Sequence, residues 1–143
     1  MRSIRVLPVA SLLLIGLYFV FRAIAAQCNG AACDVYIPVS LLIPIAILLM
    51  VAITGVFATA AARGNKVWFA VLLTSTFIGV AGPIVALLVL RDRPDAFVAT
   101  ATVLELIVPV AALGYSVSAQ SQQRASRPGS VAVTVRRPAK FGP

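Results

Sequence analysis

Two cysteines form the first group of side chains whose type and spacing suggest chemistry. Cys28 and Cys33 are separated by Asn-Gly-Ala-Ala, and Gly30 makes closure of a small disulfide ring plausible. On the oxidising side of a membrane we expect the two thiols to form a structural disulfide. The alternative is a redox-active pair. That alternative is weaker because a membrane thiol oxidoreductase relays electrons through a second cysteine pair, and because thioredoxin-type sites have two intervening residues instead of four.

Glu105 is the second candidate, because it is the only acidic residue inside an apolar stretch of the sequence. It falls about nine residues into the fourth such stretch, near the middle of a bilayer. A carboxylate at that depth is costly, so it is by default a candidate functional group that binds a cation or passes a proton. The structural alternatives are a protonated carboxyl bonded to a hydroxyl or to another subunit, or an ion pair with Arg22. The hydroxyl groups considered are those of Thr74, Ser75, Thr76 and Thr102.

The residue types that the sequence lacks narrow the chemistry further. It contains no histidine, which removes the commonest general base and metal ligand. Zinc binding by the two cysteines would need two more ligands. The sequence also has no P-loop, no dinucleotide-binding fingerprint and no nucleophile with a neighbouring base. We therefore predict no catalytic residue, no metal site and no cofactor.

The composition determines where these side chains must sit. The chain has 143 residues, of which 61% are hydrophobic and 11% charged, and its mean hydropathy is +1.03. A soluble domain is about 45–50% apolar and about 25% charged. A water-soluble fold of this size could not cover so much apolar surface with so few charges. The sequence therefore predicts a single-domain integral membrane protein.

Apolar stretches long enough to cross a bilayer occur four times. They cover residues 6–26, 37–62, 67–90 and 96–117. About 20 helical residues span the hydrocarbon core, and only helices or closed barrels satisfy backbone groups in lipid. The connections are short, which makes successive helices antiparallel neighbours. We predict an all-α, four-helix, up-down antiparallel bundle over residues 1–119, followed by a disordered basic tail over residues 120–143.

The positions of Lys and Arg predict the orientation. Nine of the twelve lie at the N-terminus, after the second stretch or in the tail, whereas Arg22, Arg91 and Arg93 lie on the other side. This bias predicts that both termini are cytoplasmic. The Ala-rich composition, with Arg exceeding Lys, indicates a bacterial or phage genome and hence the bacterial inner membrane. An alternative is that residues 1–26, with their basic start and small residues 23–26, form a cleaved secretory signal.

Small residues predict where the helices pack. Ser75, Gly79, Gly82 and Ala86 are spaced by four, three and four residues, which places them on one face of a helix. Gly55 belongs to a similar pattern in the second stretch. Such stripes allow close approach of helices, either within the bundle or against another protein.

The functional hypothesis follows from the missing catalytic groups, the short loops and the small-residue faces. We expect a non-enzymatic accessory subunit of a larger inner-membrane complex, whose partners are the bilayer, including anionic lipids, and other membrane subunits. The alternative is a small oligomeric transporter, channel or holin-type pore that uses Glu105. A thiol-disulfide oxidoreductase ranks third. The tail has no aromatic interleaving, so we expect no nucleic acid partner.

Overall fold

The computed structural model describes residues 2–27 and 33–126, with side chains described for residues 5–27 and 42–126. These residues are helical almost throughout and contain no strand, which confirms the predicted all-α class. The elements are α1 (Arg2–Gln27), α2 (Cys33–Ala61), the short 3-10 helix η1 (Ala62–Gly64), α3 (Lys66–Val89) and α4 (Pro94–Ala125).

Within the described residues, four helices are long and apolar enough to cross a membrane. Their apolar segments contain 23 to 32 residues with mean hydropathies of 2.1 to 2.5. At 1.5 Å per residue, even 23 residues extend about 35 Å, which exceeds the roughly 30 Å hydrocarbon core. The helices therefore suit a multi-pass membrane protein.

The helix ends follow from local sequence. Asn65 precedes α3 and its side chain accepts a hydrogen bond from the backbone N–H of Trp68, at 3.4 Å. Pro94 opens α4, where its missing N–H costs nothing, and Asp95 places a negative charge in the first turn. At its other end α4 continues to Ala125, so residues 120–125, which we assigned to the tail, are helical. The tail residues 127–143 lie outside the described part.

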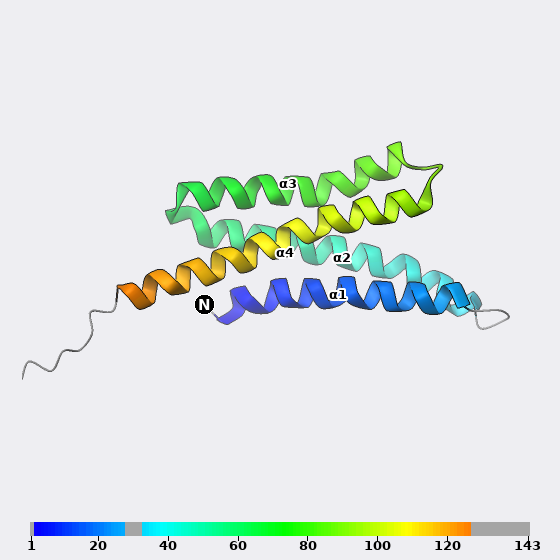
Figure 1. Cartoon of the computed structure of the whole chain (residues 1–143), viewed down its shortest axis with the longest axis horizontal. Coiled ribbons are helices and arrows are strands. Elements are labelled where there is room, and N and C mark those ends of the chain that lie inside the picture. The colour runs from blue at the N-terminus through cyan, green and yellow to red at the C-terminus, as the bar shows by residue number, and fades with distance from the viewer. Residues whose placement is uncertain (1, 28–32, 127–143) are drawn as a thin grey trace, which may run out of the picture.

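The helices form two hairpins. Chain direction reverses from each helix to the next, so that α1 lies beside α2 and α3 beside α4 (Figure 1). The first hairpin contacts the second through α2 with α3, α1 with α4 and α2 with α4. Toward the end where α1 finishes and α4 begins, the two hairpins diverge (Figure 1).

Buried apolar side chains join the hairpins in two clusters. The central cluster consists of Ile15, Ile43, Ile47, Val51 and Val108. The second cluster is built around Ala58, Ala62, Leu72 and Ala112. Next to the second cluster, the hydroxyl of Tyr115 donates a hydrogen bond to the backbone oxygen of Ala61 at 2.9 Å, which ties α4 to the end of α2.

Much of the outer surface of the four long helices is apolar. Large hydrophobic side chains on all the long helices are exposed, including Leu13 (69%), Leu49 (60%), Phe77 (73%) and Val110 (58%). Continuous apolar exposure of this kind is unfavourable in water and is expected where lipid or another membrane protein covers the surface.

The predicted small-residue positions lie where helices approach closely. A Cβ added at Gly79 would lie 2.6 Å from Cγ2 of Val108, and one at Gly82 would lie 2.8 Å from Cδ1 of Leu104. A Cβ at Gly55 would collide with the side chain of Thr76. Of the remaining positions, Ser75 and Ala86 are both buried. These small residues thus serve contacts inside the bundle.

We predict that Gly79→Leu lowers the free energy of unfolding by about 1–3 kcal/mol, because the new side chain must displace Val108 and the neighbouring helix. Thermal unfolding in detergent, followed by circular dichroism, measures the loss. Gly16→Leu is the matched control, since nothing lies within 4 Å of a Cβ at Gly16. Equal unfolding midpoints for the two variants would contradict the close packing of α3 on α4.

Candidate functional site

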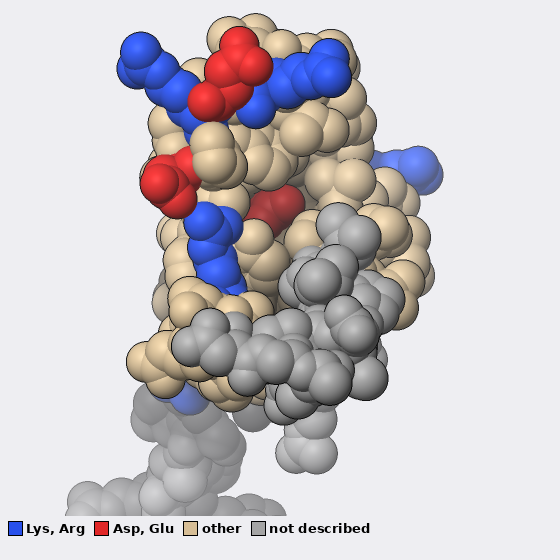
Figure 2. All heavy atoms as spheres, turned by 90° about the vertical axis from the view of Figure 1, so that its right-hand side faces the viewer, with Lys and Arg blue, Asp and Glu red and all other residues tan. Residues whose placement is uncertain are grey.

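A cleft lies where the two hairpins diverge. It encloses about 210 Å³, and all four long helices of the described region contribute to its walls. The walls are mostly apolar, with Ile47 and Leu48 from α2, Ile84 from α3 and Phe97 from α4. Figure 2 looks onto this end of the molecule and shows a hollow with acidic atoms in its depth and both basic and acidic side chains around it. The cleft is therefore an apolar cavity with a charged rim.

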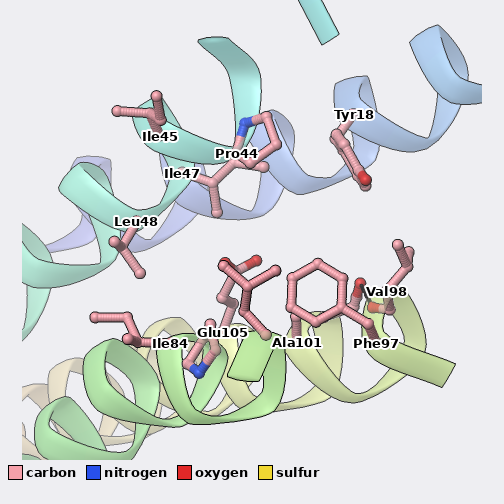
Figure 3. Close-up of a pocket in the computed structure, with 13 residues that line it drawn as sticks. Tyr18, Pro44, Ile45, Ile47, Leu48, Ile84, Phe97, Val98, Ala101 and Glu105 are labelled. Atoms are coloured by element: carbon pink, nitrogen blue, oxygen red, sulfur yellow. Dashed lines mark hydrogen bonds between the residues drawn. The ribbon is translucent and has the colours of Figure 1, made fainter. Parts of the chain in front are cut away.

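Glu105 is the acidic residue that lines this cleft. It lies on α4, about 17 Å along the helix from Pro94. Its carboxyl group points away from α4 into the space below α1 and α2 (Figure 3). Across the side chains that the structure describes, no hydrogen bond or ion pair reaches this carboxyl group. Within the described part of the chain, this carboxyl group therefore lies among mostly apolar side chains without a bonded partner.

The hydroxyl groups considered as partners of Glu105 are engaged elsewhere. Ser75, Thr76 and Thr102 each donate a hydrogen bond of 2.7 Å to the backbone carbonyl four residues earlier in their own helix. Among the described residues, none of the four candidate hydroxyls, Thr74 included, bonds Glu105. The hydroxyl-bonded alternative inside a single chain is therefore not the arrangement observed.

Arg22 lies at the mouth of the cleft and pairs with a different acid. Its Nη2 is 3.2 Å from Oδ1 of Asp95, so this contact links α1 to α4. Its Nη1 donates a long hydrogen bond of 3.5 Å to the hydroxyl of Tyr18, which lines the cleft. The side chains of Arg22 and Asp95 are 40% and 97% exposed, so the pair contributes little stability. The alternative pairing of Arg22 with Glu105 is not formed.

The inner end of the cleft is closed by packing. Val51 and Val108 are fully buried and meet at Gly79, directly below the level of Glu105. Deeper still, the hydroxyls of Ser11 and Thr54 share a buried hydrogen bond of 3.1 Å between α1 and α2. The cleft is thus closed at its inner end by buried side chains.

The predicted cysteine site cannot be placed. Cys28 lies outside the described residues, and of Cys33 only the backbone, at the start of α2, is described. The disulfide and the redox alternative both stay predictions. In the described ranges no group of three His, Cys, Asp or Glu residues is arranged to hold a metal ion.

Tyr18, Phe97 and Asp95 belong to the site but were not identified from the sequence. The rotation of α1 and α4 about their axes decides that Tyr18 and Phe97 face the cleft, and single-chain hydropathy does not encode that rotation when every face is apolar. The pairing of Asp95 with Arg22 could have been expected from the sequence. The two residues carry opposite charges, and Asp95 lies in the same short connection as Arg91 and Arg93, which the sequence predicts to share the non-cytoplasmic side with Arg22.

A second apolar depression lies on the outside of the second hairpin, between α3 and α4. It has a volume of about 470 Å³, and its lining includes Phe77, Ala81, Gly82, Val85 and Leu104. We call it the α3–α4 groove. It differs from the cleft in facing outward and in carrying no ionisable side chain among its lining residues.

Comparisons with protein-family models, with curated proteins and with solved structures found no match.

We predict that the cleft admits water-soluble reagents. In a background with both native cysteines replaced by serine, Thr102→Cys should react with a small charged methanethiosulfonate, because Thr102 lines the cleft. Thr54→Cys is the matched control and should stay unmodified in the folded protein, because Thr54 is 1% exposed. Mass spectrometry after timed labelling measures both reactions. Equal protection of the two thiols would show that the cleft is closed to water.

Proposed function

We propose that the chain is a non-enzymatic subunit of a larger assembly in the bacterial inner membrane. The observation that carries this proposal is the α3–α4 groove. The groove is apolar and lies on the outer face of the bundle. Its lining includes the small residues Ala81 and Gly82 beside the larger Phe77 and Leu104, so the surface is recessed at residues 81 and 82. Membrane helices associate where small residues let a neighbour approach closely, because packing supplies the attraction that water supplies for soluble proteins.

The occupant of the groove that we favour is a transmembrane helix of a partner subunit. A helix fills such a depression with fixed side chains, whereas lipid chains fill it only by losing conformational freedom. Phe77 and Val85 are 73% and 56% exposed, so both are free to interdigitate with a neighbour. This assignment gives the outward apolar surface of α3 a role beyond contact with lipid.

The proposed orientation places both termini in the cytoplasm and the mouth of the cleft outside. Its support is the distribution of Lys and Arg in the sequence, because Arg22, Arg91 and Arg93 fall near the cleft end and most other basic residues fall near the opposite end or in the tail. The surplus of basic residues on the cytoplasmic side would attract anionic lipid headgroups. No feature of the chain suggests a nucleic acid partner.

We predict that a photo-crosslinking amino acid at Ala81 joins the chain to one partner subunit in native membranes. The groove brings that partner within reach of position 81. Leu49, which is 60% exposed on α2, provides the matched control position away from the groove. Gel mobility and mass spectrometry of the crosslinked product identify the partner.

Crosslinks to one protein from position 81, absent from position 49, support the proposal. Crosslinks to lipid alone from both positions contradict it. A further check is Ala81→Trp, which fills the groove and should reduce the crosslink formed from a neighbouring groove position such as Val85.

A second candidate function is a small oligomeric transporter, channel or pore, favoured by the unpartnered carboxyl of Glu105 in a cleft open at one end. Because packing at Val51 and Val108 closes the inner half of the bundle, a continuous pore would have to form between copies of the chain. An oligomer in mild detergent, with cation flux lost in Glu105→Gln liposomes, distinguishes this function from the subunit role.

A further inference from the structure

The carboxyl group of Glu105 lies in surroundings that a charged group does not tolerate without a counter-ion. Apolar side chains of α2 and α3 face it across the cleft, and no described side chain bonds it. Among the side chains that the structure describes, the ionisable groups near the cleft are Tyr18 on the wall and Arg22 at the mouth, where Arg22 is already paired with Asp95. A carboxylate in an apolar setting is costly unless a positive charge accompanies it or a proton neutralises it. A cation bound in the cleft would stabilise the ionised form of this carboxyl group, and it would do so in competition with a proton.

The walls of the cleft select which kind of cation fits. Magnesium and calcium need about six or more oxygen ligands, whereas the side chains that line the cleft supply one carboxyl group and the hydroxyls of Tyr18 and Thr102. An organic cation loses less hydration and gains contact with the walls. The rings of Tyr18 and Phe97 both border the cleft, and aromatic faces attract ammonium groups.

The volume limits the size of the ligand. An apolar cavity of about 150 Å³ holds a benzene molecule. The cleft encloses about 210 Å³ and is open at the mouth, which leaves room for one aromatic ring together with a small ammonium group.

We propose that the cleft binds a small organic cation with an apolar body, whose ammonium group lies against the carboxylate of Glu105. This site goes beyond the subunit role, because the cleft faces the inside of the bundle and the α3–α4 groove faces away from it. In the complex, the ammonium group of the ligand contacts the carboxylate of Glu105, and its apolar body contacts the apolar walls of the cleft. The blind inner end makes the site a receptor for the cation within one chain.

Two isosteric probes test the proposal. Benzyltrimethylammonium carries the charge, and neopentylbenzene has the same shape with carbon in place of nitrogen. Isothermal titration calorimetry on the full chain in an uncharged detergent, corrected for empty micelles, should show one benzyltrimethylammonium bound per chain. Neopentylbenzene at the same micellar concentration should fail to displace it, because the neutral probe leaves the carboxylate unpaired.

Variants assign the binding to the cleft. Glu105→Gln keeps the shape and removes the charge, and it should weaken binding about tenfold or more. Asp92→Asn is the matched control, since it removes the same charge from an exposed turn outside the cleft and should leave the affinity unchanged. Ala101→Leu keeps the charge, narrows the cleft and should also weaken binding.

Circular dichroism and gel filtration establish that each variant is folded before titration. The proposal is overturned if the folded wild-type chain binds no benzyltrimethylammonium, if Glu105→Gln binds it as tightly, or if neopentylbenzene competes equally. The last result would identify the cleft as a site for neutral lipid chains. None of these outcomes depends on the crosslink at position 81, so the cation site and the subunit role can fail separately.

Discussion

The close contact of Gly79 with Val51 and Val108 is the constraint on which the rest of the structure depends. It joins α3 to both α2 and α4 at the middle of the bundle. Because Gly79 has no side chain, Val51 and Val108 pack directly against the backbone of α3, and the two hairpins are held closely at that level. Beyond it the hairpins diverge toward the end where α1 finishes (Figure 1). The cleft lies between the diverging hairpins.

The two ends of the cleft are held with unequal strength. At the inner end, buried apolar side chains and the bond between Ser11 and Thr54 exclude water, so opening would expose a packed core. At the mouth, the ion pair between hairpins that the described side chains form is the exposed one of Arg22 and Asp95, which contributes no more than about 1 kcal/mol. The buried packing at the floor is therefore the stronger of these two constraints. That combination suits a site that a ligand enters and leaves from one side.

The sequence was sufficient for the class of fold and for the apolar segments. Length and hydropathy located α3 within a residue or two, because Asn65 and the charged turn after Leu90 mark its ends. Length and hydropathy did not locate the end of α4, because polar residues 120–125 continue the helix beyond the apolar stretch. Hydropathy reports where a chain is apolar, and a helix that emerges from the apolar layer can continue as long as its backbone bonds are satisfied.

The candidate site was predicted only in part, for a related reason. Glu105 was identified because a single acid in an apolar stretch is conspicuous in one dimension. The residues around Glu105 were not predicted. Tyr18 and Phe97 line the same cleft only because of how α1 and α4 are oriented about their axes in the packed bundle. In a soluble helix an amphipathic pattern would indicate that rotation. Here both faces are apolar, and the rotation is decided by where glycine and valine permit close contact.

Glu105 also conflicts with the otherwise consistent apolar design of the bundle. An apolar residue at position 105 would fill the cleft and avoid the cost of a carboxyl group, so stability alone does not account for the glutamate. Local conflicts of this kind are expected where function outweighs stability. Arg22 pairs with Asp95 at the mouth and not with Glu105. An internal ion pair would have neutralised Glu105 permanently, whereas the observed arrangement leaves its charge available to a molecule from outside the chain.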